Sequence, residues 1–279
     1  MRLIPRRGPK REPLIRPEDI LLSKRITWRI DDPFTIFECR DFLPPQVYHA
    51  LTGSFPTRLL EERLHSDKGR QARLTSDDPA FADFLEWHPI WGDLHAAMMS
   101  QAFIRDVFQT MGSAMRAAFR RRPGSTLLSP VHSFLLGSKR LHRLTFELNF
   151  SISGYRLSPH IDKASKLLAV MLYFPESTSH EGAQGGTGFW RQRSDRAWDP
   201  SSLQKAGQLP RLVDAVDREN LVDSSMESFS ESFERFHVAD YRSNSMSGFV
   251  KTQNSWHDVD LRGFVAEAKR RVLLYNIRV

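Results

Sequence analysis

The sequence predicts an α+β protein with a mainly β core, in which a helical layer precedes a sandwich or barrel of strands. From Ala80 to about Arg121, apolar residues recur at spacings of three to five, as on one face of a helix. After residue 125, short segments rich in branched and aromatic residues alternate with turn signals, which is typical of a sandwich or barrel. With 279 residues, 40% of them apolar, the chain is long enough for a sizeable core.

The N-terminal half is expected to contain an arm, a strand and several helices. Residues 1–26 are rich in Pro and Arg and show no periodicity, so we expect a basic arm that is disordered or lies over the domain. Residues 27–279 are expected to form a single domain. Residues 33–57 predict a short strand followed by a helix, with Pro45 in its first turn, and the helical layer of residues 80–121 is expected to break near Pro89.

The β core is expected over about residues 125–279. A polar stretch at about residues 192–234 interrupts it, and a stretch of this length in a compact domain is usually a functional loop, a lid or a disordered insertion. The segments that predict strands are "STLLSPVHSFLL", "HRLTFELNFSI", "KLLAVMLYFP" and "RRVLLYNIRV".

Charge and cysteine content narrow the functional classes. The net charge of +7 and the pI near 9.7 are compatible with an anionic partner such as nucleic acid, a lipid headgroup or an acidic small molecule, although clustered Lys and Arg are more often a solvated face. Cys39 is the only cysteine, so an internal disulfide and a thiolate cluster are excluded, and a reducing, cytoplasmic location is expected. The longest apolar stretch, residues 167–175, is shorter than the ~20 residues that span a bilayer, and no export signal is recognisable.

Two polar residues that can bind metal stand just before the most apolar segment. His160 and Asp162 are two residues apart, a spacing that places both side chains on one side of a strand. His257 follows another apolar run and is the third candidate. Two His and one carboxylate on one face of a metal leave open positions, which is the arrangement of non-heme Fe(II) oxygenases. An isolated H-x-D is a weak signal, because a chain with ten His and 33 acidic residues contains one by chance.

The order of several motifs resembles the Fe(II)- and 2-oxoglutarate-dependent dioxygenases, in particular the bacterial branch related to prolyl 4-hydroxylases. The resemblance covers roughly residues 33–57 and 144–279 and implies a double-stranded β-helix (jelly roll, cupin-like) with flanking helices on its larger sheet. It rests on "GYRLSPHID", "GAQGGTGFW", "FVKTQNSWHDV" and "RRVLLYNI".

The resemblance also implies roles for individual residues. His160, Asp162 and His257 would bind iron, and Arg270 or Arg271 would pair with the distal carboxylate of 2-oxoglutarate, for which a bidentate Arg is suited. Arg270 is favoured, although Val272 stands where the family commonly has Ser. Tyr155 and Lys251 are candidates for the pocket, or ordinary strand residues. Gly185 and Gly186 are interpreted as a structural turn with positive φ.

The implied activity is hydroxylation of an unactivated C–H bond with Fe(II), 2-oxoglutarate and O2, releasing succinate and CO2; ascorbate would be an accessory reductant. The substrate stays open: an amino acid or peptide natural product, a protein side chain, or a sugar or lipid-linked sugar, with an anionic substrate compatible with the basic charge. The DNA-alkylation-repair branch is disfavoured, because its second Arg, six residues further on, is replaced by Asn276 or Ile277.

Three other possibilities concern partners and class. The basic arm could contact a membrane surface. The protein could be a non-catalytic, cupin-like metal- or ligand-binding protein, or a basic nucleic-acid-binding protein whose affinity falls steeply with salt. The sequence does not predict an oligomeric state.

Overall fold

Two antiparallel sheets form the centre of the protein. The computed structural model describes residues 11–67, 69–120, 143–163, 165–195 and 229–278. In order across the larger sheet, the strands are β1 (Ile26–Ile30), β2 (Ile36–Cys39), β9 (Met246–Val250), β6 (Lys166–Tyr173), β11 (Lys269–Arg278), β4 (Arg143–Ile152) and β3 (Gln71–Thr75). The smaller sheet has the order β5 (Arg156–His160), β10 (Trp256–Asp260), β7 (Gly188–Gln192) and β8 (Phe233–Val238).

From β4 onward the chain alternates between the two sheets. β4, β6, β9 and β11 belong to the larger sheet, whereas β5, the antiparallel pair β7 and β8, and β10 belong to the smaller one. In each sheet the first and last of these strands therefore become neighbours, with β4 beside β11 and β5 beside β10. This is the topology of a double-stranded β-helix, and the predicted fold class is confirmed.

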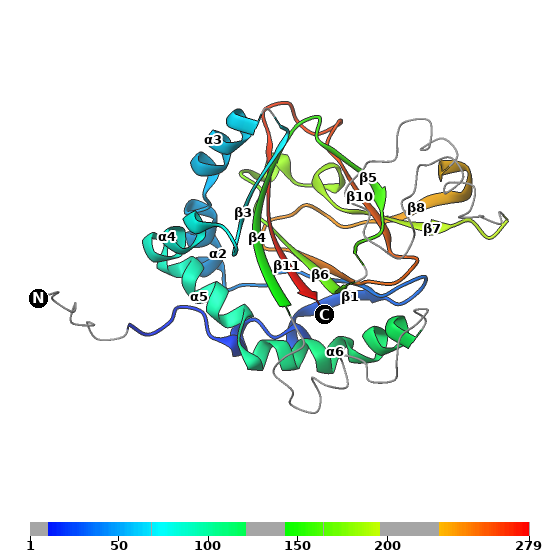
Figure 1. Cartoon of the computed structure of the whole chain (residues 1–279), viewed down its shortest axis with the longest axis horizontal. Coiled ribbons are helices and arrows are strands. Elements are labelled where there is room, and N and C mark those ends of the chain that lie inside the picture. The colour runs from blue at the N-terminus through cyan, green and yellow to red at the C-terminus, as the bar shows by residue number, and fades with distance from the viewer. Residues whose placement is uncertain (1–10, 68, 121–142, 164, 196–228, 279) are drawn as a thin grey trace, which may run out of the picture.

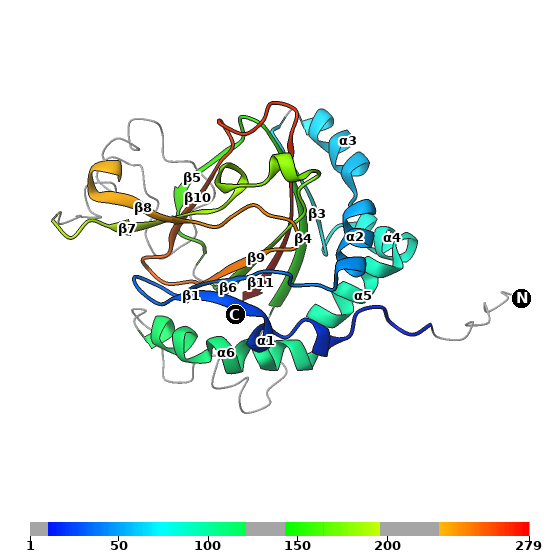
Figure 2. The same cartoon turned by 180° about the vertical axis from the view of Figure 1, so that it is seen from behind.

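Helices cover the outer face of the larger sheet (Figures 1 and 2). Phe103 of α6 packs edge-on against Tyr275 of β11, with ring centroids 5.7 Å apart, and the Tyr275 hydroxyl donates to the carbonyl oxygen of Met98 at 3.1 Å. The predicted break at Pro89 is present between α4 and α5. The helices are α1 (Leu22–Arg25), α2 (Pro45–Gly53), α3 (Thr57–Asp67), α4 (Pro79–Trp87), α5 (Pro89–Met98) and α6 (Gln101–Arg120), with short 3-10 turns η1 (Pro17–Asp19), η2 (Thr178–His180) and η3 (Ala183–Gly185).

The two faces of β11 belong to different cores. Leu273, Tyr275 and Ile277 pack under the helices, whereas Val272 and Leu274 face the space between the sheets. Because both faces of the central strands are covered, they are apolar almost throughout, which is why "KLLAVMLYFP" was recognisable as a strand.

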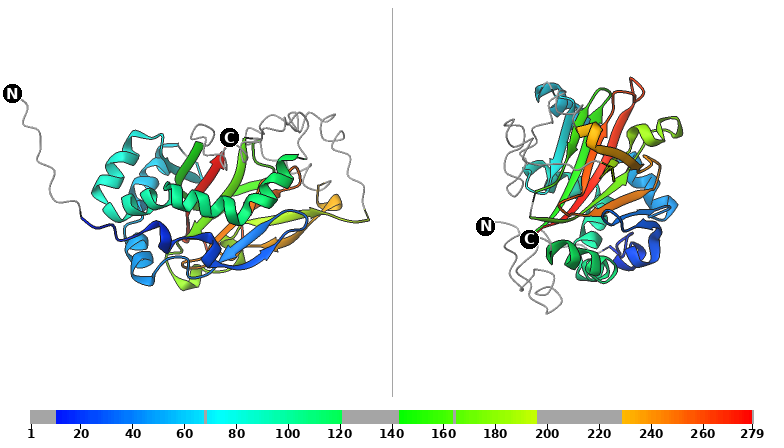
Figure 3. Two further views of the ribbon diagram at one scale, coloured as in Figure 1. Left: turned by 90° about the horizontal axis from the view of Figure 1, so that it is seen from below. Right: turned by 90° about the vertical axis from the view of Figure 1, so that its right-hand side faces the viewer.

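Residues of the expected N-terminal arm pack against the helices and the larger sheet. Ile15, Ile20 and Leu22 are buried in the core, and the backbone N–H of Ser23 donates to Asp106 of α6 at 3.1 Å. Figure 3 shows this N-terminal segment beside α6. The three apolar residues lie among Pro and charged residues without periodic spacing, so the sequence pattern did not reveal them.

Some sequence predictions fall outside the described residues. The strand expected within residues 125–136 lies in the gap at 121–142, and most of the polar stretch at 192–234 lies in the gap at 196–228. Conversely, α3 and β3 were not predicted. Among the described residues, no helix combines the length and hydropathy needed to cross a membrane.

Candidate metal centre and adjoining pocket

The three candidate ligands meet at the open end of the space between the sheets. His160 is the last residue of β5 and lies opposite His257 of the neighbouring strand β10. One potential ligand atom from each of His160, Asp162 and His257 lies within 4.8 Å of the others. Asp162 lies outside β5, in the link to β6, so the strand pleat assumed from the H-x-D spacing does not set the direction of its carboxylate.

Backbone carbonyls orient both histidines in the same way. The Nδ1 atoms of His160 and His257 lie 2.9 and 3.0 Å from the carbonyl oxygens of Ser158 and Ser255, respectively. A carbonyl oxygen only accepts, so each Nδ1 carries the proton and each Nε2 presents a lone pair. Fixing the tautomer through the second nitrogen is how metal-binding imidazoles are generally held.

The local charges favour a neutral pair of histidines beside an ionised carboxylate. Burial lowers the pKa of His160, and burial together with the neighbouring imidazole lowers the pKa of His257 to about 3. Burial acts to raise the pKa of Asp162, but the Lys166 ammonium, 2.7 Å from Oδ1, and the two imidazoles outweigh it, so the pKa lies well below its usual value. These are the protonation states that metal binding requires.

One oxygen of the Asp162 carboxylate has no hydrogen-bond donor in the described part of the chain. Oδ2 of Asp162 is buried without a hydrogen bond from any described residue, and it lies 3.7 Å from Nε2 of His257. A buried, ionised oxygen without a donor is costly unless a cation binds it. The donor set of two imidazole nitrogens and one carboxylate oxygen fits Fe(II), and it leaves coordination positions for further ligands.

Arg270 and Arg271 point in opposite directions from β11. Arg270 lines a cavity of about 160 Å³ that also contains His160, Asp162 and His257. Its Nε donates to the carbonyl oxygen of Gly185 at 2.6 Å, and its guanidinium carbon lies 5.7 Å from the centroid of the Tyr173 ring. Arg271 instead lies over the ring of Phe55 and donates to the carbonyl oxygen of Phe174, on the helical side of the sheet.

Of the other two pocket candidates, only Tyr155 lines this cavity. Burial raises the pKa of its phenol, so the hydroxyl stays protonated. Lys251 is buried after β9 and is not among the residues that line the cavity.

The Gly-Gly turn is structural, but for a different reason from the one expected. Neither Gly185 nor Gly186 has a positive φ. A Cβ on Gly186 would lie 1.8 Å from the carbonyl oxygen of Ala239, and one on Gly185 would lie 2.5 Å from the Tyr241 ring. The segment that contains Ala239 and Tyr241 passes so close to the turn that both positions require glycine.

A polar wall opposite the metal ligands was not predicted. It is formed by alternate residues of β3, β4 and β11, which share the inner face of the larger sheet. The alternation of polar and apolar residues in "RLTFELNFS" was a signal for it. The wall residues that line the cavity are Gln71, Arg73, Glu147, Asn149, Arg270, Asn276 and Arg278.

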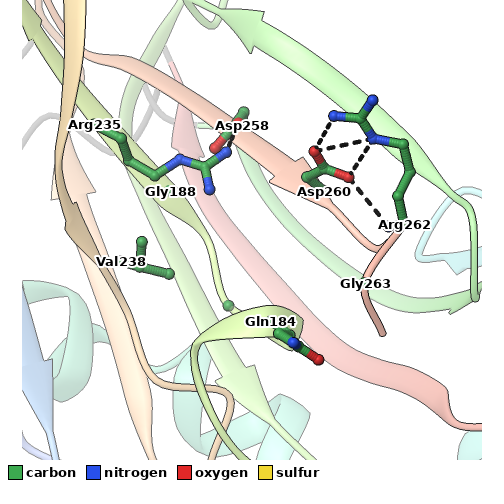
Figure 4. A pocket seen from close by; sticks show the side chains of 9 residues that line it. Gln184, Gly188, Arg235, Val238, Asp258, Asp260, Arg262 and Gly263 are labelled. Carbon is green, nitrogen blue, oxygen red and sulfur yellow. Dashed lines mark hydrogen bonds and ion pairs between the residues drawn. The ribbon is translucent and has the colours of Figure 1, made fainter. Parts of the chain in front are cut away.

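A second cavity, of about 560 Å³, lies along β7, β8 and β10 (Figure 4). Its four charged side chains form two ion pairs, Arg235 with Asp258 and Arg262 with Asp260. None of the three candidate metal ligands lines it, and we assign no function to it.

Comparisons with known proteins give matches only among solved structures. Neither the protein-family models nor the curated proteins that were searched match this chain. A prolyl-4-hydroxylase from Pseudomonas putida is 13% identical, covers 87% of this chain and 91% of its own, and has a TM-score of 0.43. HygX from Streptomyces hygroscopicus, with nickel and 2-oxoglutarate bound, is 14% identical over 87% and 82% of the two chains, with a TM-score of 0.43.

A third similar structure is a prolyl hydroxylase from Trichoplax adhaerens in complex with a peptide fragment of hypoxia inducible factor. It is 11% identical, covers 87% of this chain and 83% of its own, and has a TM-score of 0.44. Structural similarity at this level does not assign an activity. The activity depends on the side chains around His160, Asp162 and His257.

Proposed function

We propose that the protein is an Fe(II)- and 2-oxoglutarate-dependent dioxygenase that hydroxylates a C–H bond of its substrate. The observation that carries this proposal is the Asp162 oxygen that has no hydrogen-bond donor among the described residues. It lies beside two imidazoles of fixed tautomer, in one cavity with a buried Arg. A site that only binds metal has no need of a guanidinium in the same cavity.

His160, Asp162 and His257 would hold iron, which supplies O2 activation when bound. Arg270 would bind the distal carboxylate of 2-oxoglutarate through its guanidinium, and Tyr155 would contribute a hydroxyl in the same cavity. The proposed overall reaction converts substrate R–H, O2 and 2-oxoglutarate into R–OH, succinate and CO2. One oxygen atom of O2 goes to the substrate and the other to succinate.

The orientation of Arg270 supports its role over Arg271. Gly185 and Thr187 hold Arg270 from the side of the smaller sheet, while Tyr173 covers one face of the guanidinium. Because the Arg270 side chain is already held in place before the ligand binds, it loses little conformational entropy on binding. We expect a small-molecule or peptide substrate in a cytoplasmic setting.

The test is an anaerobic titration of Fe(II)-loaded protein with 2-oxoglutarate, following the visible charge-transfer band of the chelate. We expect a band in wild type, none in His160→Ala, and a need for at least about tenfold more 2-oxoglutarate in Arg270→Lys, because a bidentate charged contact is lost. Arg271→Lys is the matched control and should keep the wild-type affinity, with thermal unfolding checked for each variant.

Absence of a band in folded, iron-loaded wild type would contradict the dioxygenase proposal. The alternative would then be a non-catalytic, cupin-like metal-binding protein, because the three ligands alone are sufficient to bind a metal.

A further inference from the structure

The inner face of the larger sheet carries a second arginine at the far end of the same strand as Arg270. Arg278 is the last residue of β11, and it lines the cavity together with the candidate metal ligands. In register it lies opposite Lys166 of β6 on one side and Arg143 of β4 on the other. Three cationic residues are therefore neighbours in the backbone register at this end of the sheet, and the side chains of Arg278 and Lys166 line the cavity.

Arg278 has no counter-ion among the described residues. Its Nε is buried and makes no hydrogen bond there. The two carboxylates of the cavity are already engaged: Asp162 with Lys166, and Glu147 with Asn149 at 2.7 Å and Arg73 at 3.4 Å. A buried guanidinium N–H without an acceptor is costly, so an acceptor from outside the chain would be bound favourably.

Arg270 and Arg278 are too far apart to share one small co-substrate. They are eight residues apart on the same face of β11, which corresponds to about 26 Å at a rise of about 3.3 Å per residue. A five-carbon dicarboxylate held by Arg270 cannot reach Arg278. The two arginines therefore serve different anionic groups.

We propose that Arg278 binds an anionic group of the substrate, either a carboxylate or a phosphate. This inference rests on the proposed function, because it assigns the substrate class of the same site. Lys166 holds Asp162 and lies next to Arg278 in the sheet, so the anion at Arg278 would sit beside the metal centre. The substrate is then an acidic molecule, anchored at the end of the cavity away from Arg270.

The first experiment measures anion binding by calorimetry, with full-length, Fe(II)-loaded protein under anaerobic conditions and saturating 2-oxoglutarate. The probes are inorganic phosphate and, separately, acetate, which distinguish a phosphate site from a carboxylate site. We expect one of them to bind wild type, Arg278→Lys to bind it more weakly, and Arg278→Gln to lose about tenfold or more in affinity, as for loss of a charged hydrogen bond.

Arg143→Gln is the matched control. Arg143 is the neighbour of Arg278 in the sheet, but its side chain is exposed, pairs with Asp77 and does not line the cavity. We expect it to bind phosphate or acetate as wild type does. Equal losses in Arg143→Gln and Arg278→Gln would mean a diffuse basic rim, and no binding of either probe to wild type would remove the anion site; both results overturn the proposal.

The 2-oxoglutarate band of the same samples separates the two proposals. It should remain in Arg278→Gln if Arg278 serves the substrate alone, and its loss there would mean that Arg278 belongs to the co-substrate site. Absence of the band in wild type would count against the dioxygenase, while phosphate or acetate binding lost only in Arg278→Gln would still support the anion site.

Discussion

His160 and His257 lie directly opposite each other on the paired strands β5 and β10, with ring centroids 4.2 Å apart. The two histidines are 97 residues apart in sequence (257 − 160), and their strands are brought together because the chain alternates between two sheets. The topology therefore places side by side the two histidines that would hold a metal.

Replacement of Asp162 by Asn should remove most of the metal affinity. The substitution keeps the size of the side chain but removes the negative charge beside the two imidazoles. We expect Fe(II) to bind at least about 100-fold more weakly, since even outer-shell partners cost 10–100-fold. Competition with a chelator under anaerobic conditions measures the affinity. Asp260→Asn is the control, because Asp260 lies on the same strand as His257 but pairs with Arg262; this variant should bind Fe(II) as wild type does. Equal Fe(II) affinities in the two variants would exclude Asp162 as a ligand.

Replacement of Gly186 by Ala should destabilise the fold, because the new Cβ would overlap the carbonyl oxygen of Ala239. We expect a loss of about 3 kcal/mol in the free energy of unfolding, at the upper end for overpacking. Gly53→Ala is the matched control: its Cβ would meet no atom within 4 Å at the end of α2, and a gain of about 0.4–1 kcal/mol is expected. Urea unfolding of both variants tests this, and similar stabilities would show that the turn tolerates a side chain.

The thiol of Cys39 should be unreactive in the folded protein. Burial raises its pKa to about 12, and the side chain lies in the core under the helices. A thiol-specific reagent at pH 8 should therefore react only in urea. Below its ordinary pKa of 9.0, the thiol should not affect the pH dependence of stability. Between pH 9.0 and about 12, the thiol ionises in the unfolded chain but not in the folded protein, so the free energy of unfolding should fall as the pH rises. Rapid labelling of native protein would contradict this, and Cys39→Ala is the reagent control.

The sequence predicted those parts of the protein that depend on local pattern. β6 and β11 were recognisable because both faces of these strands are covered and their apolar runs are long. β4 was recognisable from its branched and aromatic residues, which alternate with polar ones. His160 and Asp162 were proposed as ligands from their fixed spacing, and His257 from its place after another strand. The structure brings potential ligand atoms of all three within 4.8 Å of one another.

Features that depend on long-range contacts were missed. β3 is a five-residue edge strand of mixed polarity, and only its pairing with β4 brings Gln71 and Arg73 to the cavity. The sequence left Arg270 and Arg271 as alternatives, because adjacent residues in a strand face opposite sides and the register of β11 decides which one faces the metal centre. Arg278 carried no signal, since its significance comes from a missing partner in three dimensions.

Asp78 caps α4 and pairs with Arg63. Its carboxylate accepts from the backbone N–H of Ala80 at 2.9 Å, and the hydrogen bond from Arg63 holds its pKa below the ordinary value of 3.8. The stabilisation should be present above pH 3.8 and disappear as the pH falls through the lowered pKa of the folded state. Asp78→Ala should cost about 1–2 kcal/mol at pH 7, because both the cap and the ion pair are lost.

Asp78→Asn separates these two contributions, because Asn still caps the helix but cannot form the ion pair. We expect its stability at pH 7 to lie between those of wild type and Asp78→Ala. The advantage of wild type over Asp78→Asn should shrink as the pH is lowered from 7 to 3, since protonation of Asp78 removes the charge that distinguishes them. Urea unfolding at a series of pH values measures the difference, and a constant gap across the series would show that the charge of Asp78 does not contribute.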